Sequence, residues 1–119
     1  MQTGFLTTHV LDTARGVPAG GFHITLLRLN NGKYTAISSR ITNNDGRTDI
    51  PILPADDFEP GKYRMVFHAG PYLDAHFSDL PDPKFLSDIP IDFNMADSGS
   101  HYHVPLLLSP FGYSTYRGS

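Results

Sequence analysis

The residues of this chain best suited to chemistry are histidines in its first and last strand-like segments. His101 and His103 are separated by one residue, and His9 lies near the other end of the chain. Side chains two residues apart on a strand project from the same face, so both rings of the His-x-His pair point the same way. Histidine exchanges a proton near neutral pH, and the same spacing can hold a metal ion. The pattern therefore indicates either acid–base chemistry or a metal site.

Apolar alternation indicates that these histidines face away from the protein core. If Leu6 and Val10 of the first strand point into the core, His9 faces outward. One face of the segment 101–108 is fully apolar or aromatic and contains Tyr102, Val104, Leu106 and Leu108. The opposite face contains His101, His103, Pro105 and Leu107. An outward histidine has no packing role, although a single histidine is most often an ordinary surface residue. We interpret His23, His68 and His76 in that ordinary way.

A zinc site formed by His9, His101 and His103 is the metalloprotein interpretation, because alternating histidines on a strand are a real ligand spacing. The chain contains no cysteine, which excludes disulfides, thiolate nucleophiles and cysteine-ligated metals. It also lacks the glycine-rich phosphate-binding motifs, the His-Glu-x-x-His helix and the Gly-x-Ser-x-Gly turn. The sequence therefore predicts no cofactor and no serine nucleophile, with zinc as the alternative.

The elements that must position these residues are short strands separated by turn residues. The predicted strands are 5–11, 22–29, 34–41, 47–50, 62–69, 89–93, 101–108 and 113–117. One helix is predicted over 71–80, because Pro71 suits a first helical turn and apolar residues follow at helical spacing. About eight strands and one helix predict an all-β fold, a two-sheet β-sandwich, and the length predicts a single domain over residues 1–119.

Composition limits the classes of partner. The chain has 12 Asp and Glu against 9 Lys and Arg, a formal net charge of −3, whereas nucleic-acid-binding domains are typically basic. No apolar stretch approaches the roughly 20 residues of a membrane span, and the N-terminal residues lack the pattern of a secretory signal. We therefore expect no nucleic-acid or membrane partner and a cytoplasmic location, with the peroxisome as the alternative. The ending Arg-Gly-Ser is not a Ser-Lys-Leu address.

Three ordered motifs resemble the signature of the transthyretin-like 5-hydroxyisourate hydrolases. The first is the block from His9 to Gly20, where the hormone-carrying transthyretins have lysine in place of the histidine. The second is the turn Asn44-Asp45-Gly46-Arg47-Thr48. The third is the ending Tyr116-Arg117-Gly118-Ser119. Together they span residues 9–119, which is nearly the whole chain.

The resemblance implies a prealbumin-like sandwich of two four-stranded sheets with one short helix after the fifth strand. It implies a hydroxyisourate hydrolase of urate (purine) degradation, which opens a cyclic amide of 5-hydroxyisourate to give 2-oxo-4-hydroxy-4-carboxy-5-ureidoimidazoline. It also implies a homotetramer whose central channel holds the sites, with no required cofactor or metal. The alternative within the family is a small-ligand carrier without catalysis, which His9 and the Tyr-Arg-Gly-Ser ending disfavour.

The same resemblance implies which residues form the site. The implied catalytic residues are His9, Arg47, His103 and Ser119. The implied substrate-binding residues are His9, Arg47, Tyr116, Arg117 and Gly118. Arginine's fixed fork of donors suits a planar, oxygen-rich ligand such as a urate derivative. The two catalytic histidines are expected to activate water near neutral pH. Which of them is the base, and whether His101 takes part, stays open at this point.

Overall fold

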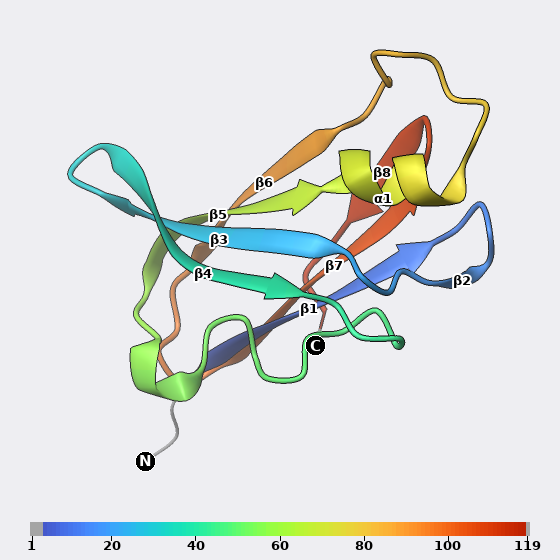
Figure 1. Cartoon of the computed structure of the whole chain (residues 1–119). Helices are drawn as coiled ribbons and strands as arrows, with labels where there is room; N and C mark the ends of the chain where they lie inside the picture. Colours follow the sequence, from blue (N-terminus) through green and yellow to red (C-terminus); the bar gives the residue numbers. More distant parts are fainter. Residues whose placement is uncertain (1–3, 119) are drawn as a thin grey trace.

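The computed structural model describes residues 4–118, which fold into two four-stranded sheets that face one another (Figure 1). One sheet has the strand order β2-β1-β7-β8 and the other β4-β3-β5-β6. The strands are β1 (Phe5–Asp12), β2 (Val17–Pro18), β3 (His23–Asn30), β4 (Lys33–Ile41), β5 (Gly61–His68), β6 (Asp88–Met95), β7 (His101–Ser109) and β8 (Gly112–Thr115). The helix α1 (Ala69–His76) follows β5 at one end of the sandwich, and a 3₁₀ turn, η1 (Ala55–Asp57), precedes β5. The predicted sandwich with one helix is confirmed.

The core lies between the sheets and is formed by alternate residues of each strand. In β1 the buried apolar residues are Leu6 and Val10, and β7 buries the four residues that its alternation predicted. The facing sheet contributes Ile24, Leu26, Tyr63, Met65 and Phe67. Because side chains alternate across a strand, this burial places the odd-numbered residues of β1 and β7 on the outer face of their sheet. The predicted outward orientation of the histidines is therefore confirmed.

The strands from the two ends of the chain, β1 and β7, lie side by side at the centre of one sheet and run parallel. The other long pairings in the sandwich are antiparallel. The parallel register pairs Phe5 with His101, Thr7 with His103 and His9 with Pro105. This pairing gathers histidines from both ends of the sequence on one outer face.

The predicted edge strand over 47–50 is wrong. The segment is an irregular loop that meets β1 only at isolated bridges, which pair Arg47 with His9 and Leu53 with Leu6. Pro51 and Pro54 have no backbone N–H, so a continuous ladder cannot form through this stretch. The loop nevertheless brings the Asp-Gly-Arg turn against β1. Elsewhere, Val17 and Pro18 form the short strand β2 where a turn was predicted.

The helix starts earlier and ends earlier than the predicted range 71–80. It covers Ala69–His76, and Phe77 is its C-terminal cap. The backbone of Phe77 is extended, and its N–H donates to the Leu73 carbonyl. Proline after Leu80 disfavours helical backbone at that residue, so the helix does not continue to it. Phe77 and Leu80 still pack against the core. Within residues 4–118, no helix is long and apolar enough to cross a membrane.

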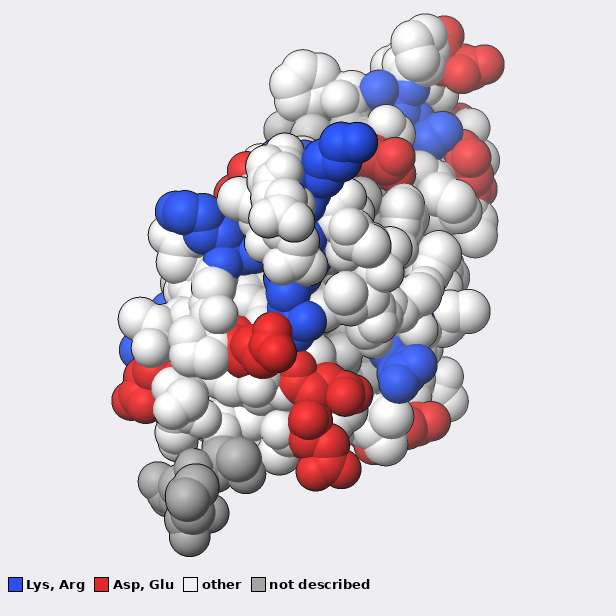
Figure 2. Space-filling view, turned by 90° about the vertical axis from the view of Figure 1, so that its left-hand side faces the viewer, with Lys and Arg blue, Asp and Glu red and all other residues white. Residues whose placement is uncertain are grey.

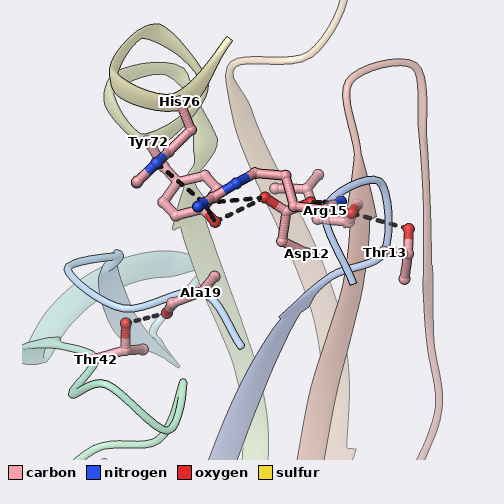
Figure 3. A network of polar contacts seen from close by, with 8 residues as sticks. Asp12, Thr13, Arg15, Ala19, Thr42, Tyr72 and His76 are labelled. Carbon is pink, nitrogen blue, oxygen red and sulfur yellow. Dashed lines mark hydrogen bonds and ion pairs between the residues drawn. The ribbon is translucent and has the colours of Figure 1, made fainter. Parts of the chain in front are cut away.

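A polar network ties the end of β1 to the helix (Figure 3). The Asp12 carboxylate, only 2% exposed, accepts a hydrogen bond from the Tyr72 hydroxyl at 2.7 Å. Arg15 donates to the Tyr72 hydroxyl at 3.2 Å and to Nδ1 of His76 at 3.0 Å. Burial and the Asp12 carboxylate raise the pKa of Tyr72 to about 12, so its hydroxyl stays a donor at neutral pH. The network anchors β1 on the face opposite to its histidine.

Candidate active site

A pocket of about 330 Å³ lies on the outer face of the β2-β1-β7-β8 sheet, where β1, β7 and the loop after β4 meet. We call it the histidine pocket, and its lining residues are Thr7, Thr8, Arg47, Thr48, His101 and His103. The sequence predicted three of these residues as chemically important. The structure brings Arg47 and both histidines of the His-x-His pair into the lining of one pocket, and the backbone bridge between His9 and Arg47 places His9 next to it.

The ring of His9 has a defined proton position. Its Nε2 lies 2.9 Å from the carbonyl oxygen of Asp45. A carbonyl oxygen only accepts, so Nε2 carries the proton and Nδ1 of the neutral ring holds a lone pair. Gly46 makes this approach possible, because its φ of +75° and its lack of a Cβ let the turn lie against Val10 and the His9 ring. The Val10 N–H donates to the Gly46 carbonyl at 2.8 Å and fixes the turn.

His103 is half-buried and is held on two sides. Its Nδ1 lies 2.7 Å from the hydroxyl oxygen of Thr7. Its carbonyl accepts the Gly118 N–H at 2.7 Å, which brings the C-terminal segment back along β7. Among residues 4–118, Nε2 of His103 has no hydrogen-bond partner. That nitrogen is the one left for a ligand in the histidine pocket.

Electrostatics favour the neutral form of both histidines. Burial is the main cause that lowers the pKa of His103, and the positive charge of Arg47 lowers it further, followed by His101 and His9. The pKa of His9 is also lowered, first by burial and then by Arg47, although hydrogen bonding to Asp45 opposes the shift. A histidine with a lowered pKa stays unprotonated to a lower pH. Both rings are therefore available as proton acceptors at neutral pH.

Arg47 is placed as an exposed cation at the mouth of the site. Its backbone is fixed, because its N–H donates to Asn43 and its carbonyl accepts the Asn43 N–H at 2.7 Å. Its guanidinium makes no ion pair and no hydrogen bond within residues 4–118. The donor fork is therefore open to an oxygen-rich ligand.

The remaining predicted site residues lie outside the histidine pocket. Tyr116 is 59% exposed and is not among the lining residues. Arg117 stacks over the ring of Tyr102 with its Cζ 4.3 Å from the ring centroid. Gly118 contacts the backbone and ring of His103. Ser119 lies outside the described residues.

Sequence reasoning missed Thr7, and it left His101 undecided. Thr7 shares the outward face of β1 with His9, which was visible in the alternation, but only the parallel register with β7 places it between two imidazoles. His101 lies 2.6 Å from the Thr7 hydroxyl through Nε2, and its ring stacks on Phe5 with centroids 4.2 Å apart.

Outside the histidine pocket, neither the arrangement of possible metal ligands nor a second pocket matches the predicted chemistry. Within residues 4–118, no three histidine, aspartate or glutamate side chains are grouped to hold a metal ion. A larger pocket of about 480 Å³ lies between β4 and the segment 52–59, with Arg28, Arg40 and acidic residues of η1 on its walls. It contains no histidine, and its acidic residues Asp56, Asp57 and Glu59 share the walls with Arg28 and Arg40. On the face in Figure 2, several acidic side chains adjoin one another at the lower centre, below a group of basic side chains.

Known proteins share this fold and much of this sequence. Residues 6–118 match the Transthyretin model, described as the HIUase/Transthyretin family. The chain belongs to this family. The 5-hydroxyisourate hydrolase 2 of Rhizobium meliloti (strain 1021) is 54% identical over 118 residues, which cover 99% of this chain and 98% of the relative. Membership confirms the predicted resemblance and the prealbumin-like sandwich.

Solved structures of this family include both an enzyme and a hormone-bound transthyretin. The structure of Klebsiella pneumoniae 5-hydroxyisourate hydrolase is similar with a TM-score of 0.78 and 32% identity, and the match covers 100% of both chains. Sea bream transthyretin in complex with thyroxine is similar with a TM-score of 0.85 and 29% identity, covering 95% of this chain and 93% of that one. The fold is thus common to both, and the function must be argued from the site.

Proposed function

We propose that this protein is a hydrolase that adds water to 5-hydroxyisourate and opens a cyclic amide of it. The observation that carries the proposal is a pair of outward histidines, His9 and His103, whose pKa values are both lowered beside Arg47. The relatives named for this substrate support it, with 54% identity over nearly the whole chain in Rhizobium meliloti. Ligand carriage alone needs no neutral base, so these histidines favour hydrolysis over the carrier role.

In the proposed mechanism, His103 is the general base. Its Nε2 is the free ring nitrogen in the histidine pocket, and it removes a proton from water as the water oxygen bonds to the amide carbonyl carbon. The carbon–nitrogen bond of the ring then breaks, and the imidazolium returns the proton to the leaving nitrogen. His9 presents the lone pair of Nδ1, which can accept the second proton of the same water in a hydrogen bond.

Arg47 supplies positive charge where the amide oxygen becomes negative. Its guanidinium makes no ion pair among the described residues, and Arg47 lines the same pocket as His103. Preorganised donors of this kind stabilise a developing oxyanion by about 2.7–4 kcal/mol. The same charge lowers the pKa of both histidines, so Arg47 serves the base and the oxyanion together. Tyr116, Arg117, Gly118 and Ser119 are proposed to complete substrate binding.

The proposed active form is a homotetramer in which this outer sheet face is covered. Support comes from the half-buried Leu107 on that face and from Tyr113 and Tyr116, which are exposed in the single chain. Exposed apolar patches usually mark interfaces. Sedimentation should give about four times the chain mass of 13.1 kDa. An active monomer would contradict this assembly.

The absence of cysteine fits a reducing compartment, and we place the protein in the cytoplasm.

The direct test of the activity uses freshly prepared 5-hydroxyisourate. This compound decays spontaneously, and the decay is followed by absorbance. The protein should accelerate the decay in proportion to the protein concentration. Protein treated with a metal chelator should be equally active. Decay at the spontaneous rate with folded protein would contradict the proposed function. Thyroxine binding without hydrolysis would favour the carrier alternative.

A further inference from the structure

Thr7 lies between two imidazole rings and contacts both. Its Oγ1 is 2.7 Å from Nδ1 of His103 and 2.6 Å from Nε2 of His101. The register of β1 and β7 sets this position, since Thr7 pairs directly with His103 and Phe5 pairs with His101. The Phe5 ring stacks on His101 with an interplanar angle of 9°, which holds the His101 ring in place. Three side chains from two strands thus form one chain of hydrogen bonds.

The proton count in this chain restricts the tautomer of His103. A hydroxyl has one proton to donate, so Thr7 can donate to only one of the two rings. The other ring must donate its own N–H to the Thr7 oxygen. If Thr7 donates to His103, the proton of neutral His103 is on Nε2, and that nitrogen cannot act as a base. If Thr7 donates to His101, His103 carries its proton on Nδ1 and leaves Nε2 free.

We infer that Thr7 and His101 are positioning residues that hold His103 in the tautomer with a free Nε2. Thr7 accepts the Nδ1–H of His103 and donates its own proton to Nε2 of His101. When Nε2 of His103 takes a proton from water, the Nδ1–H bond to Thr7 remains and strengthens, because its donor is now charged. Donation from Thr7 to His101 also makes the Thr7 oxygen a better acceptor. This inference rests on the proposed function only for its kinetic consequence.

The test is Thr7→Val, which keeps the branched shape and removes the hydroxyl. Thr25→Val is the matched control, because Thr25 contacts Nε2 of His68 at 3.0 Å on the other sheet. Thr7→Val should lower kcat about 10- to 100-fold, because His103 then loses part of the rate enhancement that a correctly positioned general base supplies. KM should change little. Thr7→Ser should restore most of the rate, and Thr25→Val should leave it unchanged. A raised KM with normal kcat would instead show that Thr7 only contacts substrate, which contradicts the inference.

A second readout does not depend on the activity. Nitrogen NMR of the histidine rings at neutral pH should report the Nδ1–H tautomer for His103 in the natural protein and a loss of that preference in Thr7→Val. An Nε2–H tautomer in the natural protein would overturn the inference, whereas a protein with the expected tautomer but no hydrolysis would overturn only the proposed function.

Discussion

Gly118 lies directly against the imidazole of His103. Its N–H donates to the His103 carbonyl at 2.7 Å, and a Cβ at this position would be 2.6 Å from Cδ2 of the ring. The C-terminal segment therefore bounds one side of the proposed base. The lack of a side chain at residue 118 is what lets the segment and the ring occupy their present places.

Gly118→Ala is expected to displace the His103 ring and lower kcat about 100-fold, since misplaced reacting groups lose much of their effect. The fold should survive, because the residue is outside the core. Gly112→Ala is the matched control in the same hairpin, where a Cβ would meet only Ser109 Oγ at an ordinary 3.7 Å. Steady-state kinetics with circular dichroism checks the pair. Equal, near-normal rates for both variants would show that the ring is not held by this contact.

Arg47 should control the pH dependence of the reaction. Its positive charge lowers the pKa of His9 and His103, so removing that charge favours protonation of both rings and raises their pKa values. In Arg47→Met, the acid limb of kcat/KM should therefore move to higher pH. Arg47→Lys keeps the charge and should keep the acid limb. Profiles from pH 5 to 9 test this directly.

The same two variants separate charge from geometry. Lysine cannot reproduce the donor fork, so Arg47→Lys should still lose about 100-fold in kcat, close to the loss in Arg47→Met. Full activity in the lysine variant would leave Arg47 only a general electrostatic role. An unmoved acid limb in the methionine variant would show that neither histidine is the group that titrates.

Tyr72 should matter for stability and not for catalysis. Its hydroxyl satisfies the buried Asp12 carboxylate on the core side of β1, away from the histidine pocket. Tyr72→Phe should lower the free energy of unfolding by about 1–3 kcal/mol, the cost of an unmet buried acceptor. Tyr34→Phe is the control, because the Tyr34 hydroxyl makes no hydrogen bond within residues 4–118. Urea unfolding at equal protein concentration measures both, and unchanged stability in Tyr72→Phe would contradict the role of the network.

Sequence patterns predicted the strands and the outward direction of the histidines, because alternation is a local property that burial enforces. They did not predict that β1 pairs with β7 in parallel, which depends on contacts between the ends of the chain. Thr7 was missed for that reason, since its neighbours His101 and His103 belong to the other strand. The strand predicted after Arg47 failed because prolines interrupt the ladder. The position of Arg47 beside His9 was likewise visible only in three dimensions.

The central claim is that His9 and His103 act together on the water that opens 5-hydroxyisourate. The most direct measurement is the decay of freshly made 5-hydroxyisourate with the natural protein, His9→Asn and His103→Asn, with His23→Asn on the outer face of the other sheet as control. Each of the two site variants should lose at least about 100-fold in turnover while remaining folded, and the control should match the natural protein. Near-normal rates in both His9→Asn and His103→Asn would contradict the account.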